Sequence, residues 1–145
     1  MSTKRSAASS GRRPPEPVLT ILTDECLGRY DVPEALRLAG ATVIAHHEKF
    51  PTGALDEVWL AALAEHPEWI VLTKDAQIRR RPLERQAYSN ARARVFTLTS
   101  GNLTGAQQAE ILVRALPKIR KLARRRGPFI AKVTASGIVE ILKLK

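Results

Sequence analysis

The sequence has few of the features that mark secreted or membrane proteins. It contains a single cysteine, Cys26, so no internal disulfide can form and a reducing compartment is expected. No apolar run approaches the roughly 20 residues that a transmembrane helix needs. The charged N-terminus lacks the apolar segment of a secretion signal. We therefore expect a cytoplasmic protein that does not span a membrane, and we expect Cys26 to be a small buried residue rather than a reactive thiol.

Acidic residues are scarce in one half of the chain and abundant in the other. Residues 76–127 contain 13 Arg or Lys and two acids, whereas residues 18–75 contain ten acids and four bases. The net charge of the whole chain is +10. A basic half of this kind is expected to bind phosphate backbones or an acidic partner, or only to keep the protein in solution. Composition favours neither interpretation.

The length of 145 residues suits one domain with a core of two or three layers. Residues 1–17 are rich in Ser, Arg and Pro and show no apolar periodicity, so we expect a disordered basic tail. The folded domain is expected to occupy residues 18–145.

Strands and helices are predicted to alternate along this domain. The expected strands are 18–23, 41–46, 69–75, 94–99, 129–133 and 138–144, and the expected helices are 32–40, 55–65, 83–90 and 105–125. Thr104 and Gln107 form a capping-box pattern before the last helix, and Pro117 is expected to kink or divide it. This order predicts an α/β fold, a three-layer, doubly wound, mostly parallel sheet with a C-terminal β-hairpin.

Acidic side chains follow two of the predicted strands. Asp24 and Glu25 come directly after the first strand, Asp75 ends the third, and Asp56 lies at the start of the second helix. Ligands of open α/β sheets bind outside the carboxyl ends of the strands. Clustered carboxylates repel one another unless a cation compensates them, and oxygen ligands suit Mg²⁺ or Mn²⁺. Such an ion would acidify a water molecule and hold a phosphate oxygen.

Each of these residues also has a structural interpretation. Asp24 could cap a helix, Asp56 suits the positive end of a helix dipole, and Asp75 could pair with a neighbouring cation. His46 and His47 end the second predicted strand, where a hydrogen-bonded or exposed histidine is expected. Residue types and spacing therefore leave a metal site and a set of structural roles equally open.

Three stretches of the sequence resemble the motifs of PIN-like domains. They are Leu22–Gly28 (LTDECLG), Asp56–Leu60 (DEVWL) and Val71–Asp75 (VLTKD), with a continuation into Ile78–Pro82 (IRRRP). The likeness is nearest to the PIN-like proteins grouped with VapC-type toxins of bacterial toxin–antitoxin pairs. It covers roughly residues 18–133.

This resemblance implies a metal-dependent ribonuclease that cuts single-stranded RNA with Mg²⁺ or Mn²⁺ as cofactor. Its catalytic, metal-binding acids fall on Asp24, Asp56 and Asp75, and Glu25 is an adjacent acid that would assist. The resemblance also implies a cognate antitoxin protein that blocks the site. A homodimer is left open.

Basic residues flank the last of these acids. Lys74 precedes Asp75, and Arg79, Arg80 and Arg81 follow it closely. We expect these four residues to bind the RNA, against the alternative that the run is only a solvated charged surface.

The sequence departs from the wider family after the fourth strand, where a fourth acid is usual. That region reads Leu98–Asn102 (LTSGN) and contains no carboxylate. The departure favours an alternative, a non-catalytic PIN-like module that binds RNA or protein and keeps a vestigial acid cluster. Thr99 or Asn102 could replace the acid as a weak ligand. A receiver-type domain is a further rival, but its lysine should follow a later strand, and no lysine follows strand 94–99.

Overall fold

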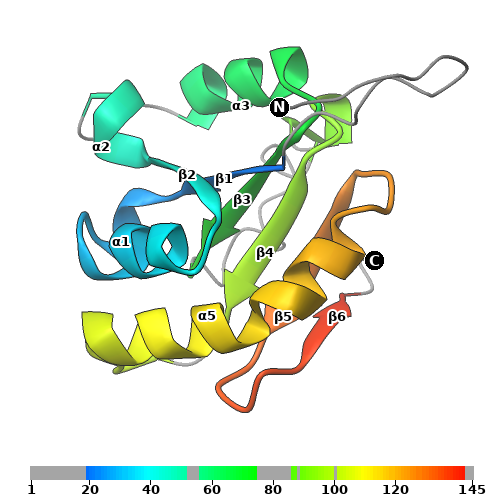
Figure 1. Ribbon diagram of the computed structural model, residues 1–145. Helices are drawn as coiled ribbons and strands as arrows, with labels where there is room; N and C mark the ends of the chain where they lie inside the picture. Colours follow the sequence, from blue (N-terminus) through cyan, green and yellow to red (C-terminus); the bar gives the residue numbers. More distant parts are fainter. Residues whose placement is uncertain (1–18, 52–55, 75–85, 88, 100, 143–145) are drawn as a thin grey trace, which may run out of the picture.

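The structure is a computed structural model that describes residues 19–51, 56–74, 86–87, 89–99 and 101–142 (Figure 1). Of residues 56, 57 and 59 only the backbone is described. The predicted basic tail therefore lies outside the described residues.

Six strands form one sheet in the order β2-β1-β3-β4-β5-β6. The strands are β1 (Thr20–Thr23), β2 (Thr42–Ala45), β3 (Trp69–Thr73), β4 (Arg94–Leu98), β5 (Phe129–Val133) and β6 (Val139–Ile141). Neighbours from β2 to β5 are parallel, and β6 pairs with β5 in the antiparallel sense. The predicted α/β fold with a mostly parallel sheet and a C-terminal hairpin is confirmed.

Helices cover both faces of this sheet. They are α1 (Asp31–Leu38), α2 (His46–Lys49), α3 (Asp56–Glu65) and α5 (Gly105–Leu122), and a 3₁₀ helix, η1 (Glu25–Leu27), follows β1. Helices α1 and α5 pack against each other over one face, and α3 lies on the other (Figure 1). The sheet is therefore the middle of three layers.

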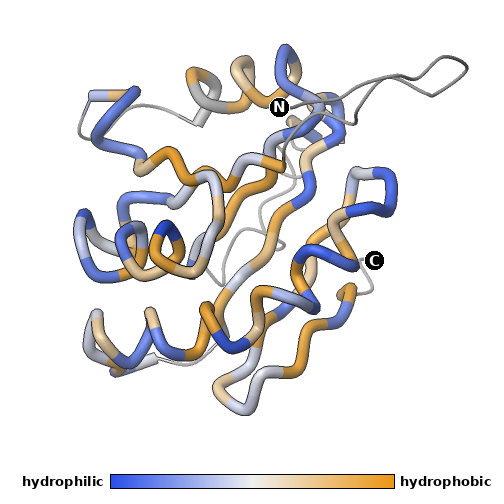
Figure 2. The backbone as a smooth tube through the Cα atoms, in the orientation of Figure 1, coloured by the Kyte–Doolittle hydropathy of each residue, from blue (hydrophilic) through white to orange (hydrophobic). Residues whose placement is uncertain are grey.

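The central strand β3 shows why the sheet is buried on both sides. All five of its residues are buried. Ile70 and Leu72 belong to the core beneath α1 and α5, whereas Trp69 and Val71 belong to the core beneath α3. A strand covered on both faces needs a nearly continuous apolar sequence. Figure 2 shows this concentration of hydrophobic residues along the central strands.

The ends of the elements follow the sequence prediction with a few differences. The capping box before α5 is confirmed, because Gln107 N donates to Thr104 Oγ1 at 3.1 Å and Thr104 N donates to Gln107 Oε1 at 2.9 Å. Division of this helix at Pro117 is wrong, since α5 continues through that residue. Residues 86–87 and 89–90 of the predicted helix 83–90 are helical, and its other residues lie outside the described ranges.

Two elements were not predicted, the 3₁₀ helix η1 after β1 and the short helix α2 after β2. The end of the predicted strand 41–46 is the start of the four-residue helix α2, so the strand stops at Ala45. Among the described helices, none has the length and apolar character required to cross a bilayer.

Candidate active site

The candidate site lies where β1 and β3 end side by side. These strands are parallel neighbours, with Thr23 paired to Leu72, so the residues that follow them meet at the same edge of the sheet. The backbone N–H of Asp24 donates to Leu72 O at 2.9 Å and holds the two strand ends together. The chain runs from β1 to β2 on one side and returns to β3 on the other. That reversal is the topological switch point at which open α/β sheets bind ligands.

Asp24 is held in place by neighbours on both strands. Its Oδ1 accepts a hydrogen bond from the backbone N–H of Glu25 at 2.8 Å, so Asp24 caps η1 as one interpretation predicted. Its Oδ2 accepts from the Thr73 hydroxyl at 2.9 Å. An ionised carboxylate offers about four acceptor positions. Oδ1 of this half-buried side chain has a single donor among the described residues and therefore keeps capacity for a further ligand.

Cys26 is part of this site and is not the buried residue that the sequence predicted. The residue is exposed. Its sulfur nevertheless contacts Thr73 Oγ1 at 3.3 Å and accepts from the Lys74 backbone N–H at 3.3 Å. Withdrawal of the sulfur from water, followed by repulsion from Asp24, raises the pKa of the Cys26 thiol. The thiol is therefore protonated at neutral pH, and at 3.6 Å it can donate to Asp24.

Glu25 and His46 form a second contact at the same edge. His46 Nδ1 lies 3.7 Å from Glu25 Oε1, and the His46 side chain is only 4% exposed. Its ring packs against Phe50 at 5.4 Å between ring centroids. Among the described residues, Nδ1 has no hydrogen-bond partner. His46 is therefore buried beside an acid, which differs from the hydrogen-bonded or exposed histidine that the sequence predicted.

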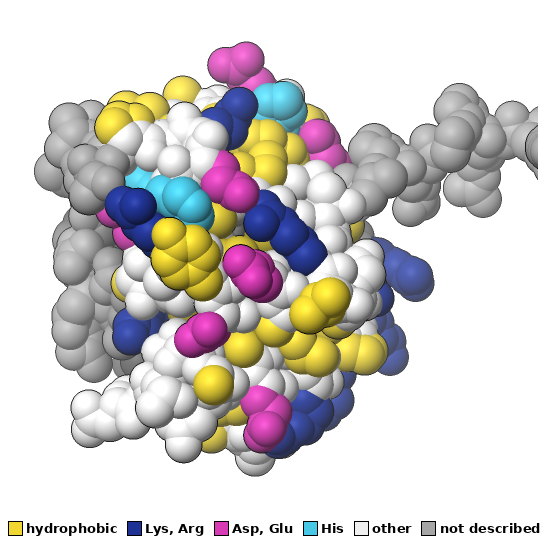
Figure 3. Space-filling view, turned by 60° about the vertical axis from the view of Figure 1, so that its left-hand side comes forward, with side chains coloured by type: hydrophobic (Ala, Val, Ile, Leu, Met, Phe, Trp, Pro, Cys, Tyr) yellow, Lys and Arg dark blue, Asp and Glu magenta, His cyan; other side chains and the backbone are white. Residues whose placement is uncertain are grey.

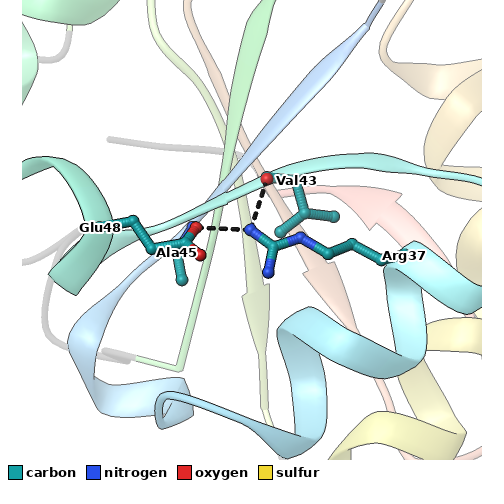
Figure 4. A network of polar contacts seen from close by, with 4 residues as sticks. All are labelled: Arg37, Val43, Ala45 and Glu48. Atoms are coloured by element: carbon teal, nitrogen blue, oxygen red, sulfur yellow. Dashed lines mark hydrogen bonds and ion pairs between the residues drawn. The ribbon is translucent and has the colours of Figure 1, made fainter.

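An ion-pair network supports the short helix that carries His46. Arg37 of α1 pairs with Glu48 of α2 and donates to Val43 O at 2.9 Å (Figure 4). Glu48 Oε1 also accepts from the Ala45 backbone N–H at 2.8 Å, which satisfies a free donor at the start of α2. The hydrogen bond from Arg37 is the main cause of the lowered pKa of Glu48. The network ties α1, β2 and α2 together next to the candidate site.

The structure brings together only part of the predicted site. Asp24, Glu25 and Lys74 lie at the carboxyl edge, and the Lys74 side chain is exposed. Asp56 is the first residue of α3, but its side chain is not described, and Asp75, Arg79, Arg80 and Arg81 lie outside the described residues. Within the described part of the chain, no three His, Cys, Asp or Glu side chains form a group that could hold a metal ion. A site with three carboxylates therefore depends on Asp56 and Asp75.

These features define an α/β domain with a strand-end carboxylate at the switch point of a parallel sheet. A family model described as "PIN like domain" matches residues 19–100. The chain belongs to this PIN-like family, as the sequence resemblance indicated. It is also 35% identical, over 126 residues, to a protein of Mycobacterium tuberculosis (strain ATCC 25618 / H37Rv) named "Putative ribonuclease VapC45". The match covers 84% of this chain and 91% of that protein. No solved structure matches the chain.

Proposed function

We propose that this protein is a metal-dependent endoribonuclease and the toxin of a toxin–antitoxin pair. The observation that carries the proposal is the carboxylate of Asp24, anchored by the Thr73 hydroxyl where two adjacent parallel strands end. Membership of the PIN-like family and the similarity to a protein named as a VapC ribonuclease support the reaction class. Fold alone would not suffice, since one fold supports many chemistries.

The residues present fit a hard divalent cation. Asp24 Oδ1 has spare acceptor capacity, and the hydrogen bond from Thr73 to Oδ2 fixes the orientation of the carboxylate, as outer partners of metal ligands usually do. We assign Asp56 and Asp75 as the other metal ligands, from their places in the two remaining sequence motifs. Carboxylates of this number suit Mg²⁺ or Mn²⁺. When bound, such an ion would stabilise charge on a phosphate oxygen and acidify water.

The other residues at this edge have supporting roles in the proposal. Glu25 lies next to Asp24 in the chain and contacts His46, so it can accept a proton close to the metal ligands. Lys74 is exposed and directly follows Thr73, which binds Asp24, and it would bind a phosphate of the RNA. Arg79, Arg80 and Arg81 would continue this contact along the RNA backbone. A cognate antitoxin would act by covering the same edge of the sheet.

A second candidate function is a non-catalytic RNA- or protein-binding module. The described residues 98–99 and 101–102 contain no carboxylate where the wider family has one. Asn102 has a positive φ of 54°, and the Thr99 hydroxyl donates to Val133 O at 3.4 Å. A site with three acids and these polar side chains would bind a second metal weakly.

The test is cleavage of a labelled single-stranded RNA of mixed sequence by the full chain with Mn²⁺ or with EDTA. We expect cleavage only with Mn²⁺, and a loss of about 100-fold or more in Asp24→Asn and Asp75→Asn. Glu65→Gln is the matched control, because Glu65 is an exposed acid at the far end of α3. Cleavage that survives both EDTA and Asp24→Asn would contradict the proposal. RNA binding without any cleavage would favour the non-catalytic module.

A further inference from the structure

A basic groove lies at the opposite edge of the sheet from Asp24. Two adjoining hollows of about 830 and 660 Å³ share Pro67, Arg94 and Arg124 in their linings. They adjoin the amino ends of the parallel strands, where Leu19, Thr42 and Arg94 lie, and the carboxyl end of α5. We call the two hollows together the amino-edge groove.

Arginines dominate the charge of this groove. Glu68 is the one carboxylate in the described lining of the two hollows. Five exposed arginines share the lining, and among the described residues none of their guanidinium groups has an ion-pair partner: Arg92, Arg120, Arg124, Arg125 and Arg126. Figure 3 shows acidic, basic and histidine side chains interspersed on another face, with basic side chains gathered towards its right-hand edge. The groove is therefore a site of concentrated positive charge.

The helix dipole explains only part of this charge. Cations are favoured at the carboxyl end of a helix, which accounts for Arg124, Arg125 and Arg126 after α5. Arg92 comes from a different segment, the turn before β4. Its backbone has a φ of 54°, a left-handed conformation that is uncommon for arginine. Such outliers persist where the surrounding structure imposes them and are found at functional sites.

Close backbone contact holds the two arginine segments together. A side chain at Gly127 would place its Cβ 2.3 Å from the carbonyl oxygen of Arg92, so only glycine permits this approach. Phe129 N also donates to Ala93 O at 3.0 Å. Backbone packing therefore brings Arg92 and the arginines at 124–126 to the same groove. A run of arginines that served only to keep the protein in solution would not require this packing.

An aromatic platform lies in the same groove. His66 stacks on the buried Trp69, with 4.2 Å between ring centroids and 7° between planes. The His66 side chain is 41% exposed, and it lines the groove together with Asn90. Proteins that bind single-stranded nucleic acid combine a positively charged groove with aromatic side chains on which bases stack.

We propose that the amino-edge groove binds single-stranded RNA, at a surface separate from the Asp24 site. The proposal rests on the proposed function in taking RNA as the substrate. The arginines would contact phosphates and the exposed face of His66 would stack on a base. RNA fits better than an acidic protein segment, because the carboxylates of such a segment would engage only the arginines, whereas the bases of RNA can also stack on the exposed ring of His66.

The experiment measures binding of a labelled 12-nucleotide single-stranded RNA to the full chain by fluorescence anisotropy in EDTA, across a range of salt concentrations. The groove variant is Arg124→Gln/Arg125→Gln. The matched control is Arg114→Gln/Lys121→Gln, which removes the same charge from exposed positions on α5 outside the lining of the groove. Thermal unfolding verifies that each variant folds.

We expect the groove variant to bind RNA at least about 10-fold more weakly. The salt slope, which is the fall in log affinity per unit of log salt concentration, should become shallower by about 0.7 for each phosphate that the variant no longer neutralises. The control should change affinity by less than about 2-fold on the same electrostatic argument. His66→Ala should weaken binding by about 5-fold or more with an unchanged salt slope, as expected when base stacking is removed and the charge is kept. Equal weakening in both double variants would overturn the proposal. RNA binding unchanged in the groove variant, with binding of polyglutamate abolished, would also overturn it and indicate an acidic protein partner.

Failure of this inference can be told from failure of the proposed function. Because EDTA removes divalent metal, binding is measured without cleavage. If the protein does not cleave RNA but its RNA binding depends on the groove, only the proposed nuclease function is contradicted. If the protein cleaves RNA with Mn²⁺ but the groove variant binds RNA as well as wild type, only the proposed role of the amino-edge groove is contradicted.

Discussion

The hydroxyl of Thr73 donates a hydrogen bond to Oδ2 of Asp24 at 2.9 Å, although the two residues are 49 positions apart in the chain. The contact joins the carboxyl ends of β1 and β3. Thr73 is 2% exposed, so its hydrogen bond to the carboxylate is shielded from competing water. The orientation of Asp24 is therefore set by a second strand as well as by its own.

Replacing Thr73 by Val removes this hydrogen bond with little change in side-chain volume. We expect the free energy of unfolding to fall by about 1–2 kcal/mol, because the variant cannot make a hydrogen bond to the charged carboxylate. Affinity for Mn²⁺ should fall by about 10-fold, as is common when an outer partner of a ligand is removed. Urea denaturation and metal titration of the same samples measure the two effects.

Thr97→Val is the matched control for that change. Thr97 pairs with Thr73 on the neighbouring strand and is also buried, but its hydroxyl has no hydrogen-bond partner among the described residues. Removing it should leave stability unchanged or raise it by up to about 1 kcal/mol. If Thr97→Val lowers the free energy of unfolding as much as Thr73→Val does, loss of the Thr73–Asp24 hydrogen bond is not the cause of the lower stability of Thr73→Val.

Arg94 has a structural role that separates it from the exposed arginines of the amino-edge groove. Its guanidinium group donates to the carbonyl oxygens of Pro67, Trp69 and Ala123, which ties the start of β3 to the end of α5. Partial burial lowers the pKa of Arg94, and the nearby Glu68 opposes this. Arg94→Met should lower the free energy of unfolding by about 2–3 kcal/mol through the unpaired carbonyls.

The control for Arg94→Met is Arg120→Met, an exposed arginine in the same hollow. We expect the free energy of unfolding of Arg120→Met to change by no more than about 0.5 kcal/mol, as for most surface substitutions. Urea denaturation compares the two variants. Similar losses of stability in both would show that general charge or packing matters more than the three carbonyl hydrogen bonds.

Glu48→Gln tests the network of Figure 4 through its pH dependence. The pKa of Glu48 is lowered in the folded protein, so ionised Glu48 stabilises the fold. This contribution to the free energy of unfolding is fully present above the ordinary glutamate pKa of about 4.3 and disappears as the pH falls through the lowered pKa. The Arg37 and Glu48 side chains are both about 40% exposed, so the free energy of unfolding of the variant should fall by less than about 1 kcal/mol at pH 7.

Thermal unfolding of wild type and Glu48→Gln between pH 7 and pH 3 measures this difference. The two curves should converge at the acid end. Glu110→Gln is the control, because Glu110 and Arg114 are more exposed and their ion pair contributes little. A difference that persists unchanged at pH 3 would exclude ionisation of Glu48 as its source.

The sequence was sufficient for the layers of this fold because its central strands are apolar and alternate with helical patterns. The run from Trp69 to Thr73 is buried on both faces, which leaves a strong signal. The helix α2 left no such signal. Four residues are too few for helical periodicity, and its first turn depends on the side chain of Glu48 reaching back to Ala45.

Of the candidate site, the sequence predicted Asp24 and the strand ends but not the contacts around them. Cys26 was expected to be buried, yet the turn of η1 leaves the residue exposed while its sulfur reaches Thr73. His46 becomes buried because α2 begins there and packs its ring on Phe50. The contact between Cys26 and Thr73 joins residues 47 positions apart, and local sequence patterns do not report contacts of that kind.

The proposed function requires that Asp24 belongs to a divalent metal site. Thermal unfolding of the full chain with and without millimolar Mn²⁺, in wild type, Asp24→Asn and the Glu65→Gln control, tests it without knowledge of the RNA. A ligand that binds only the folded state raises stability by about 2.7 kcal/mol at 100 times its Kd, which is several degrees in Tm. We predict a rise in wild type and Glu65→Gln that is absent in Asp24→Asn. An equal rise in all three proteins, or no rise in wild type, would show that Asp24 does not hold a divalent metal.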